Sequence, residues 1–341
     1  MERRDDRERD EVLAVEDLSV GFVQDETRTV LARVSLSIGR GETLGLVGES
    51  GCGKSTLGRA VMRLLPANAT MDGRIRLLGA DVLSMDERAM RRLRGGAVAM
   101  IFQNPMSALN PVLTIGRQIT EALETHTGLR GRAATARAVE LLHMVGISRP
   151  ADRAHEYPHQ LSGGMRQRAM IAMAISCDPK LLIADEPTTA LDVTVQAQIL
   201  DLLASLQEKL SMAMLFISHD MSAVASVADR IAVMYAGRIV EEGEAAPLLR
   251  DPAHPYTSGL LNSVPHVDGA RRTRLQAIPG SVSAGSADAA GCSFRPRCGF
   301  AITRCAVETP PLADIGAGRA ARCWLASADW RPAAAARSMA T

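Results

Sequence analysis

The chain has 341 residues, a length typical of about two domains. It carries 39 Lys and Arg against 38 Asp and Glu, so the formal net charge of +1 gives no strong field that would attract nucleic acid or anionic lipid. Hydrophobic residues make up 47% of the chain, which is enough for a sizeable core and excludes global disorder.

From the sequence we expect neither a membrane span nor a signal peptide. Unbroken apolar runs such as residues 97–102 are far shorter than the ~20 residues that cross a bilayer. Residues 1–11 are highly charged and lack the apolar stretch of a signal peptide, so we expect a disordered lead-in. A cytoplasmic location is therefore expected, in which disulfides between the six cysteines are unfavourable.

Strand-like and helical patterns alternate along the first 250 residues. Strands are expected at 12–20, 30–38, 43–47, 74–78, 98–102, 180–184, 212–217, 231–234 and 238–242. Helices are expected at 54–65, where Pro66 ends the pattern, at 114–146 and at 193–209. This alternation indicates an α/β fold with a mainly parallel sheet.

The composition changes near residue 251. The last 91 residues hold 8 of the 16 prolines, both tryptophans and four of the six cysteines. Their hydrophobic periodicity is weak, so residues 251–341 are expected to form a separate, irregular C-terminal extension.

A glycine-rich loop follows the strand expected at 43–47. Its sequence, Gly48-Glu-Ser-Gly-Cys-Gly-Lys-Ser55, opens a predicted helix, which is the context that a phosphate-binding loop requires. Backbone N–H groups and a helix N-terminus attract phosphate oxygens. Lys54, one of only three lysines in the chain, would contact the β- and γ-phosphates, and Ser55 would supply a hydroxyl to Mg²⁺.

Two carboxylates end the strand expected at 180–184. Asp185 would lie at the carboxyl edge of the sheet beside the phosphate loop, where it can hold Mg²⁺. Glu186 would face the γ-phosphate and polarise an attacking water. Without the phosphate loop upstream, the same pair would be read as an ordinary acidic turn.

Leu161-Ser-Gly-Gly-Met-Arg-Gln-Arg168 lies between these motifs and opens another helix. With it, the chain resembles a nucleotide-binding subunit of an ABC transporter over residues 12–250. Met165 replaces the Gln of the commonest Leu-Ser-Gly-Gly-Gln form, and Ser162 and Gly164 are unchanged. The resemblance implies a P-loop NTPase core of the RecA type, an antiparallel β-subdomain and an inserted α-helical subdomain at about 104–178.

The resemblance also assigns roles to single residues. Gln103 matches the glutamine that senses Mg²⁺ and the transmembrane partner, Asp192 matches the D-loop aspartate, and His219 matches the switch histidine. Phe22 is a candidate for stacking on adenine, with a core position as the alternative. The complete expected nucleotide-binding set is Phe22, Gly48, Ser50, Gly51, Cys52, Gly53, Lys54, Ser55, Thr56, Ser162, Gly163, Gly164 and Asp192. The expected catalytic residues are Glu186, His219 and Gln103, and the expected Mg²⁺ ligands are Ser55, Gln103 and Asp185.

A narrower resemblance concerns the oligopeptide/dipeptide permease ATPases, which also handle nickel. It is carried by the phosphate loop, by residues 103–111 and 157–168, and by His254-Pro-Tyr-Thr257, which begins that subfamily's C-terminal extension. Without the resemblance, His254-Pro-Tyr would be read as a proline turn with a buried tyrosine. The subfamily implies a second, different ATPase subunit, two transmembrane permease subunits and an extracytoplasmic solute-binding protein, at the cytoplasmic face of a bacterial plasma membrane.

Four cysteines cluster near the C-terminus: Cys292, Cys298, Cys305 and Cys323. Their spacing is looser than the Cys-x₂₋₄-Cys pairs of zinc sites, whereas iron–sulfur ligation tolerates irregular spacing. Members of the resembling subfamily can carry a [4Fe–4S] cluster here, which makes that cluster the favoured interpretation. Zinc and unliganded packing residues remain alternatives.

Cys52 is expected to fill space in the phosphate loop, with a redox switch as its alternative.

The expected function is thus an ATPase that drives solute import through a permease, with ATP bound between two subunits paired head to tail. A soluble ABC ATPase that acts on nucleic acid or ribosomes is the alternative from another class, and it predicts a basic groove or a second cassette. A regulatory subunit without turnover and an exporter ATPase are further alternatives. The permease and its extracytoplasmic binding protein are expected to select the transported solute.

Overall fold

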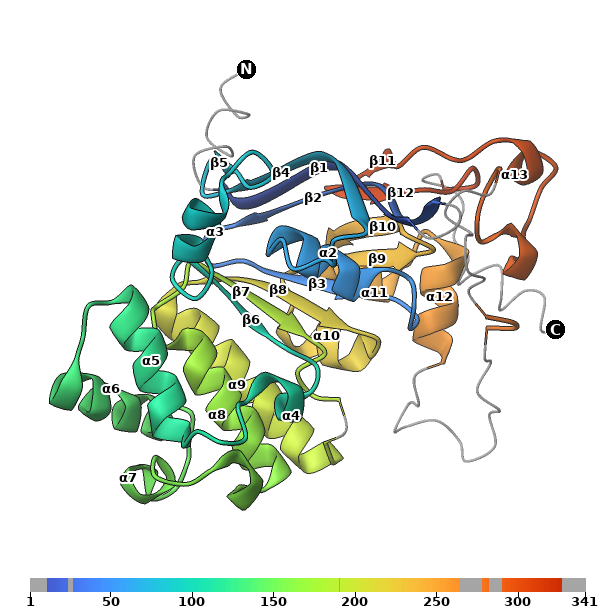
Figure 1. Cartoon of the computed structure of the whole chain (residues 1–341). Helices are drawn as coiled ribbons and strands as arrows, with labels where there is room; N and C mark the ends of the chain where they lie inside the picture. The colour runs from blue at the N-terminus through green and yellow to red at the C-terminus, as the bar shows by residue number, and fades with distance from the viewer. Residues whose placement is uncertain (1–10, 24–26, 190, 264–277, 282–289, 327–341) are drawn as a thin grey trace. The chain divides into compact units, whose positions relative to one another are not determined.

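A computed structural model describes residues 11–23, 27–189, 191–263, 278–281 and 290–326 (Figure 1). The chain divides into two compact units, each built from several stretches of sequence. Unit 1 comprises Met1–Leu13, Ile38–Thr43 and Arg76–Phe216, and unit 2 comprises Ala14–Ser37, Leu44–Ile75 and Ile217–Thr341. Within the described ranges, no helix is both long enough and apolar enough to cross a membrane.

Parallel, fully buried strands form the centre of unit 1. β6 (Val98–Ile101) pairs in parallel with β7 (Leu181–Asp185), with Val98 opposite Leu181. β8 (Ala213–Ser218), which begins in unit 1, is buried at every position. Such continuous apolar runs are typical of parallel strands that are covered on both faces.

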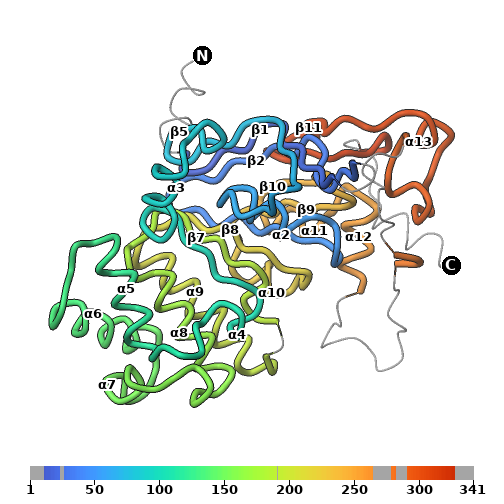
Figure 2. The backbone as a smooth tube through the Cα atoms, viewed as in Figure 1, coloured from blue at the N-terminus to red at the C-terminus, as the bar shows by residue number. Residues whose placement is uncertain are grey.

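Helices make up most of the remainder of unit 1. They are α3 (Glu87–Leu93), α4 (Pro105–Ala108), α5 (Ile115–His126), α6 (Gly131–Met144), α7 (Pro150–Arg153), η1 (Pro158–Gln160), α8 (Gly163–Ile175) and α9 (Val193–Leu210), and the short strand β5 (Ala80–Asp81) precedes α3. α5, α6 and α8 pack on one another, and Figure 2 shows α5 and α6 side by side. The single helical stretch predicted at 114–146 is two helices, because Gly128 takes a φ of +77° after α5 and reverses the chain.

Five strands lie next to one another in unit 2, in the order β11-β12-β10-β9-β3. β3 (Thr43–Val47) pairs in parallel with β9 (Arg230–Tyr235). β10 (Arg238–Glu244) continues from β9 as an antiparallel hairpin, with Ala236 and Gly237 at positive φ in its turn. A second sheet contains β1 (Glu11–Val23), β2 (Thr27–Gly39) and β4 (Ala69–Leu77), in the order β2-β1-β4.

The helices of unit 2 are short. They are α2 (Lys54–Val61), α10 (Met221–Val227), α11 (Ala245–Arg250), α12 (Pro255–Asn262), η3 (Arg295–Arg297) and α13 (Arg304–Val307). α2 ends four residues before the predicted Leu65, because Arg63 turns to a φ of 48° ahead of Pro66. Residues 1–10 of the predicted lead-in lie outside the described residues, and Glu11 already belongs to β1.

Part of the predicted C-terminal extension pairs with the last strand before it, β10. β12 (Arg319–Ala321) pairs antiparallel with β10, with Glu241 opposite Ala321, and β11 (Ala313–Gly316) pairs in turn with β12. The extension therefore adds two strands to the sheet of unit 2. These strands escaped prediction because they are very short and rich in Ala and Gly, so they show no alternation of apolar and polar residues.

A buried carboxylate fixes this arrangement. Glu241 in β10 is 0% exposed, and it accepts hydrogen bonds from the backbone N–H groups of Ala253 and His254 at 2.7 and 2.9 Å. The Arg319 guanidinium donates to the same carboxylate at 2.9 Å from β12. Burial raises the pKa of Glu241, and these donors offset the cost of desolvating its charge.

His254 begins α12 and is fully buried beside Glu241. Its Nδ1 accepts a hydrogen bond from the Tyr256 backbone N–H at 3.0 Å, which caps the helix. Desolvation, together with the smaller effect of the positive charge of Arg322, lowers the pKa of His254 to about 3. The imidazole is therefore neutral in the folded chain.

This burial predicts a specific pH dependence of stability. Below pH ~6.5 the unfolded chain protonates His254 while the folded chain does not, so folding stability falls as the pH drops through the range from ~6.5 towards 3. His254→Asn keeps a capping side chain and removes this proton. Urea unfolding at pH 7.5 and 5.5 should show the parent losing about 1.4 kcal/mol more than the variant. Equal losses in both chains would contradict a neutral, buried His254.

Candidate functional site

The glycine-rich loop leaves β3 and enters α2 in unit 2. Gly48 cannot carry a side chain, because a Cβ would lie 2.2 Å from the Met234 carbonyl oxygen. Gly53 caps α2 with a φ of 109°, a conformation that L side chains rarely adopt. The loop is thereby held close to β9, with its backbone wrapped around the start of α2.

Lys54 is buried at the start of α2 and folds back over the loop. Its Nζ donates to the carbonyl oxygens of Gly48 and Glu49 at 2.7 and 3.1 Å. The Cys52 thiol is 1% exposed, and burial raises its pKa, which keeps it protonated and unreactive. These contacts support the packing interpretation of Cys52 over the redox switch.

The two carboxylates of unit 1 differ in their surroundings. Asp185 ends β7 and is 1% exposed. Glu186 follows it with a φ of 48°, a sparsely populated conformation that concentrates at functional sites. The Glu186 Oε2 atom accepts hydrogen bonds from the Gln103 side-chain amide at 2.8 Å and from the Thr189 hydroxyl at 2.9 Å. The structure thus joins Gln103 to Glu186 across 83 residues of sequence.

Two helix starts also lie close together in unit 1. Ser162 caps α8 by accepting from the Met165 N–H at 3.3 Å, and Asp192 caps α9 by accepting from the Val195 N–H at 2.9 Å. A Cβ on Gly164 would lie 3.1 Å from a Val195 methyl group, so this glycine permits the close approach. Ser162 and Asp192 are both exposed. Each helix therefore presents its N-terminus and a polar cap to solvent.

The remaining predicted residues are more scattered. His219 follows β8 and is exposed, directly before Asp220, which caps α10. Phe22 is half-buried near the end of β1. Ser50 and Gly51 are exposed in the phosphate loop, and Thr56 lies half-buried in the first turn of α2.

Sequence analysis missed two residues that contact the phosphate loop. The Tyr256 hydroxyl accepts a hydrogen bond from the Glu49 backbone N–H at 2.8 Å, and Arg297 binds the Glu49 carboxylate through two nitrogens at 2.6 and 2.8 Å. Hydrogen bonding to Glu49 raises the pKa of the Arg297 guanidinium. Tyr256 is buried, as the proline-turn interpretation predicted, but nothing local in the sequence indicates its partner 207 residues away.

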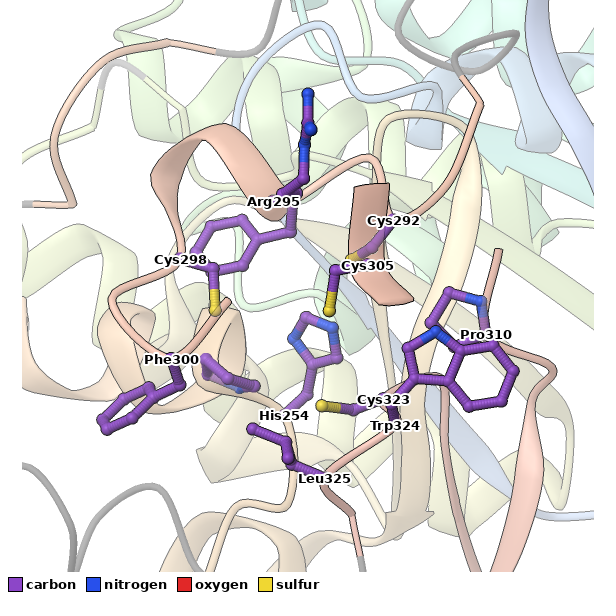
Figure 3. A pocket seen from close by; sticks show the side chains of 12 residues that line it. His254, Cys292, Arg295, Cys298, Phe300, Cys305, Pro310, Cys323, Trp324 and Leu325 are labelled. Carbon is purple, nitrogen blue, oxygen red and sulfur yellow. The ribbon is translucent and has the colours of Figure 1, made fainter. Parts of the chain in front are cut away.

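The four late cysteines line one small cavity, together with His254, Phe294, Trp324 and other side chains (Figure 3). All four are free thiols. Burial raises the pKa of Cys292 and Cys298, and raises that of Cys323 to about 11. Among the described residues, no group of three or more His, Cys, Asp or Glu side chains is arranged to hold a metal ion.

Each unit therefore offers one set of polar groups suited to a nucleotide. Unit 2 presents a glycine-rich loop with a buried lysine, which suits an anionic phosphate chain. Unit 1 presents a buried aspartate and a hydrogen-bonded glutamate at a strand end, which suit a hydrated cation and a water nucleophile.

Comparison with known families gives two matches along the chain. Residues 31–189 match the ABC transporter family, and residues 240–305 match the C-terminal region of oligopeptide/dipeptide transporters. The second match begins in β10 and includes Tyr256 and Arg297.

Several curated proteins are similar over nearly the whole chain. A probable peptide ABC transporter ATP-binding protein, y4tR of Sinorhizobium fredii, is 49% identical over 92% of this chain and 95% of its own length. A putative peptide import ATP-binding protein of Brucella melitensis is 51% identical over 85% of this chain and 89% of its own length.

A solved structure extends the likeness to the fold. The ATP-binding cassette MJ0796, in a dimeric post-hydrolysis state bound to ADP and phosphate, is 27% identical with a TM-score of 0.62, and the match covers 68% of this chain and 98% of that one. This likeness agrees with the predicted α/β nucleotide-binding fold. The extensive identity to ATP-binding subunits, together with the two family matches, shows that the chain belongs to the ABC transporter family as one of its ATPases.

Proposed function

We propose that this chain binds and hydrolyses ATP to power the import of peptides or related solutes through a membrane permease. The observation that carries the proposal is the match of both the cassette and the C-terminal region to peptide-transport ATPases, at about half identity over most of the chain. The alternative of an ATPase that acts on nucleic acid has no comparable support.

The predicted site residues take separate roles in this proposal. The loop residues 48–56 and Lys54 bind the phosphates, with Phe22 against the adenine. Ser55, Gln103 and Asp185 hold Mg²⁺, which neutralises phosphate charge when it is bound. Support for the unit 1 roles comes from the Gln103–Glu186 hydrogen bond and from the burial of Asp185.

Glu186 orients and polarises the attacking water, and His219 contacts the γ-phosphate. The hydrogen bonds from Gln103 and Thr189 hold the Glu186 carboxylate in one orientation. Both donors bond to the same oxygen, Oε2, and the positive φ of Glu186 fixes the backbone beneath it. Such preorganisation places a base without reorganisation during the reaction.

We further propose that two ATPase subunits, one of them a different chain, pair head to tail. Ser162, Gly163, Gly164 and Asp192 would then act on the nucleotide that the partner's phosphate loop holds. The exposure of Ser162 and Asp192 at adjacent helix starts supports this assignment, and the solved cassette cited above is dimeric.

The other partners follow from the same proposal. They are two permease subunits at the cytoplasmic face of a bacterial plasma membrane and, indirectly, an extracytoplasmic solute-binding protein. Residues 12–250 would form the cassette, with 104–178 as its helical subdomain, and residues 251–341 would form the subfamily's extension.

We also propose that the four cysteines hold a [4Fe–4S] cluster. Support comes from their donor set: four free thiols reach a single cavity from four positions along the chain. Burial raises the pKa of Cys292, Cys298 and Cys323, and a bound metal centre would supply positive charge that favours their thiolates. The described side chains form no single-ion site, so this proposal rests on the shared cavity alone. The cluster would cross-link a segment that has little apolar core of its own.

The first test concerns Glu186, the proposed general base. Glu186→Gln should retain ATP binding and lower turnover at least about 100-fold, because an amide preserves shape but cannot accept a proton. ATPase activity is measured in the assembled transporter, and peptide uptake in cells should be lost with it. Glu208→Gln removes an exposed carboxylate of α9 and should leave both intact. Turnover within about threefold of the parent would contradict the role of Glu186.

A second test addresses the composite site. Ser162→Arg should abolish cooperative ATP hydrolysis while the chain folds normally, because a bulky cation at the start of α8 blocks closure on the partner's nucleotide. Thr135→Arg places the same side chain at an exposed position of α6 and serves as the control. Parental activity of Ser162→Arg in the assembled transporter would rule out the shared site.

A third test addresses the cysteines. Protein purified without oxygen should be brown, absorb near roughly 400 nm and carry about four irons. Cys305→Ser should bleach this colour and make the C-terminal region sensitive to protease, whereas Cys177→Ser, outside the cavity, should do neither. One zinc without iron would replace the cluster by a zinc site, and the absence of both metals would leave four packing residues.

A further inference from the structure

Glu49, the second residue of the phosphate loop, carries a negative charge that would repel an anionic ligand. Glu49 follows Gly48 directly, and its carbonyl oxygen accepts from the same Lys54 Nζ that is proposed to bind phosphate. A carboxylate at this position, if it were not neutralised, would repel a nucleoside triphosphate. By Coulomb's law, a unit charge a few ångströms from the phosphates weakens binding roughly tenfold or more.

In the structure this carboxylate is neutralised by the C-terminal region. Arg297 meets both Glu49 oxygens in a bidentate pair at 2.6 and 2.8 Å, and the Arg297 side chain is only 5% exposed. Bidentate guanidinium–carboxylate pairs fix geometry as well as charge. The pair therefore neutralises the carboxylate and fixes its orientation.

A second contact fixes the same residue from another element. The Tyr256 hydroxyl on α12 accepts from the Glu49 N–H at 2.8 Å. The Tyr256 ring lies 4.7 Å from the ring of Tyr235 at the end of β9, and 5.4 Å from that of Phe294. Both the backbone and the side chain of Glu49 are thus held by residues beyond position 250.

Arg297 is itself firmly held. Its Nε donates to the Pro279 carbonyl oxygen at 2.7 Å, and a second nitrogen reaches the Gly280 carbonyl oxygen at 3.2 Å. The guanidinium also lies over the rings of Tyr235 and Phe294, at 5.7 and 6.0 Å from their centroids. Because the Arg297 side chain is already held in place, it loses little further conformational entropy when it binds Glu49.

We infer that Arg297 is a positioning residue for nucleotide binding: it neutralises Glu49 and, with Tyr256, holds the first turn of the phosphate loop in a shape that accepts phosphate. The C-terminal region then contributes directly to the ATP site of its own chain. This role does not depend on whether the cysteines bind a metal.

The test is a double-mutant comparison in the full-length chain, with ATP and Mg²⁺ as the probe and calorimetry as the measurement. Arg297→Met should weaken ATP binding about tenfold, because it exposes the Glu49 charge to the phosphates. Glu49→Gln in the same chain should restore the affinity to within about threefold of the parent, because the charge is gone. A purely structural role would predict no such restoration.

Arg304→Met is the matched control. It breaks another short ion pair of the C-terminal region, Arg304–Glu308 at 2.8 Å, which lies on the surface. Its ATP affinity should equal that of the parent. Circular dichroism and thermal unfolding verify that each variant folds, and kcat at saturating ATP in the assembled transporter should change less than about twofold for Arg297→Met.

Three results would overturn the inference. They are an unchanged ATP affinity in folded Arg297→Met, a lost affinity that Glu49→Gln does not restore, and an equal loss in the Arg304→Met control. Should Arg297→Met not fold, Arg297→Gln retains donors for the carbonyls of residues 279 and 280 and replaces it in the same comparison. Failure of both variants to fold would assign the pair to stability and would also overturn the inference.

Discussion

The burial of one carboxylate governs the C-terminal half of unit 2. A charge at the fully buried position of Glu241 is tolerated only when donors surround it, and they come from the start of α12 and from β12. These donors fix His254, and through it the helix that carries Tyr256. The contact of Tyr256 with the phosphate loop therefore depends on an ion pair that lies outside the loop.

Several side chains of the candidate site have two roles. They cap helices or end strands, and they also carry the proposed chemistry. Ser162 and Asp192 satisfy helix N-termini and present their oxygens to solvent. Glu186 is held by an amide and a hydroxyl from different segments. Residues that are already oriented for structural reasons need little reorganisation when substrate and partner arrive.

Local sequence motifs predicted much of the fold and of the candidate site. The phosphate loop, the strand before it and the carboxylates after β7 each have a short signature, and the predicted strands differ from the observed ones by only a few residues at each end. The ends of α2 and α5 were missed because single residues at positive φ, Arg63 and Gly128, decide them. Nothing in the apolar periodicity records such a residue.

Pairings between distant segments were beyond sequence reasoning. Arg297 and Glu49 are 248 residues apart, and neither neighbourhood carries a pattern that names the other. Nothing local in the sequence marks Glu241 as buried, because burial is a property of the assembled sheet. The proline-rich composition of the extension correctly indicated irregular structure but concealed two short strands.

The pairing of β12 with β10 has a consequence for how this protein can be divided. A chain that stopped at residue 250 would leave β10 as an open edge, with unpaired N–H and C=O groups that invite strand-to-strand aggregation. Such a chain would also leave the buried Glu241 carboxylate without its hydrogen-bond donors from Ala253, His254 and Arg319. The nucleotide-binding portion is thus not an excisable module, and any gene fusion or split protein built from it has to keep the strand that closes the sheet.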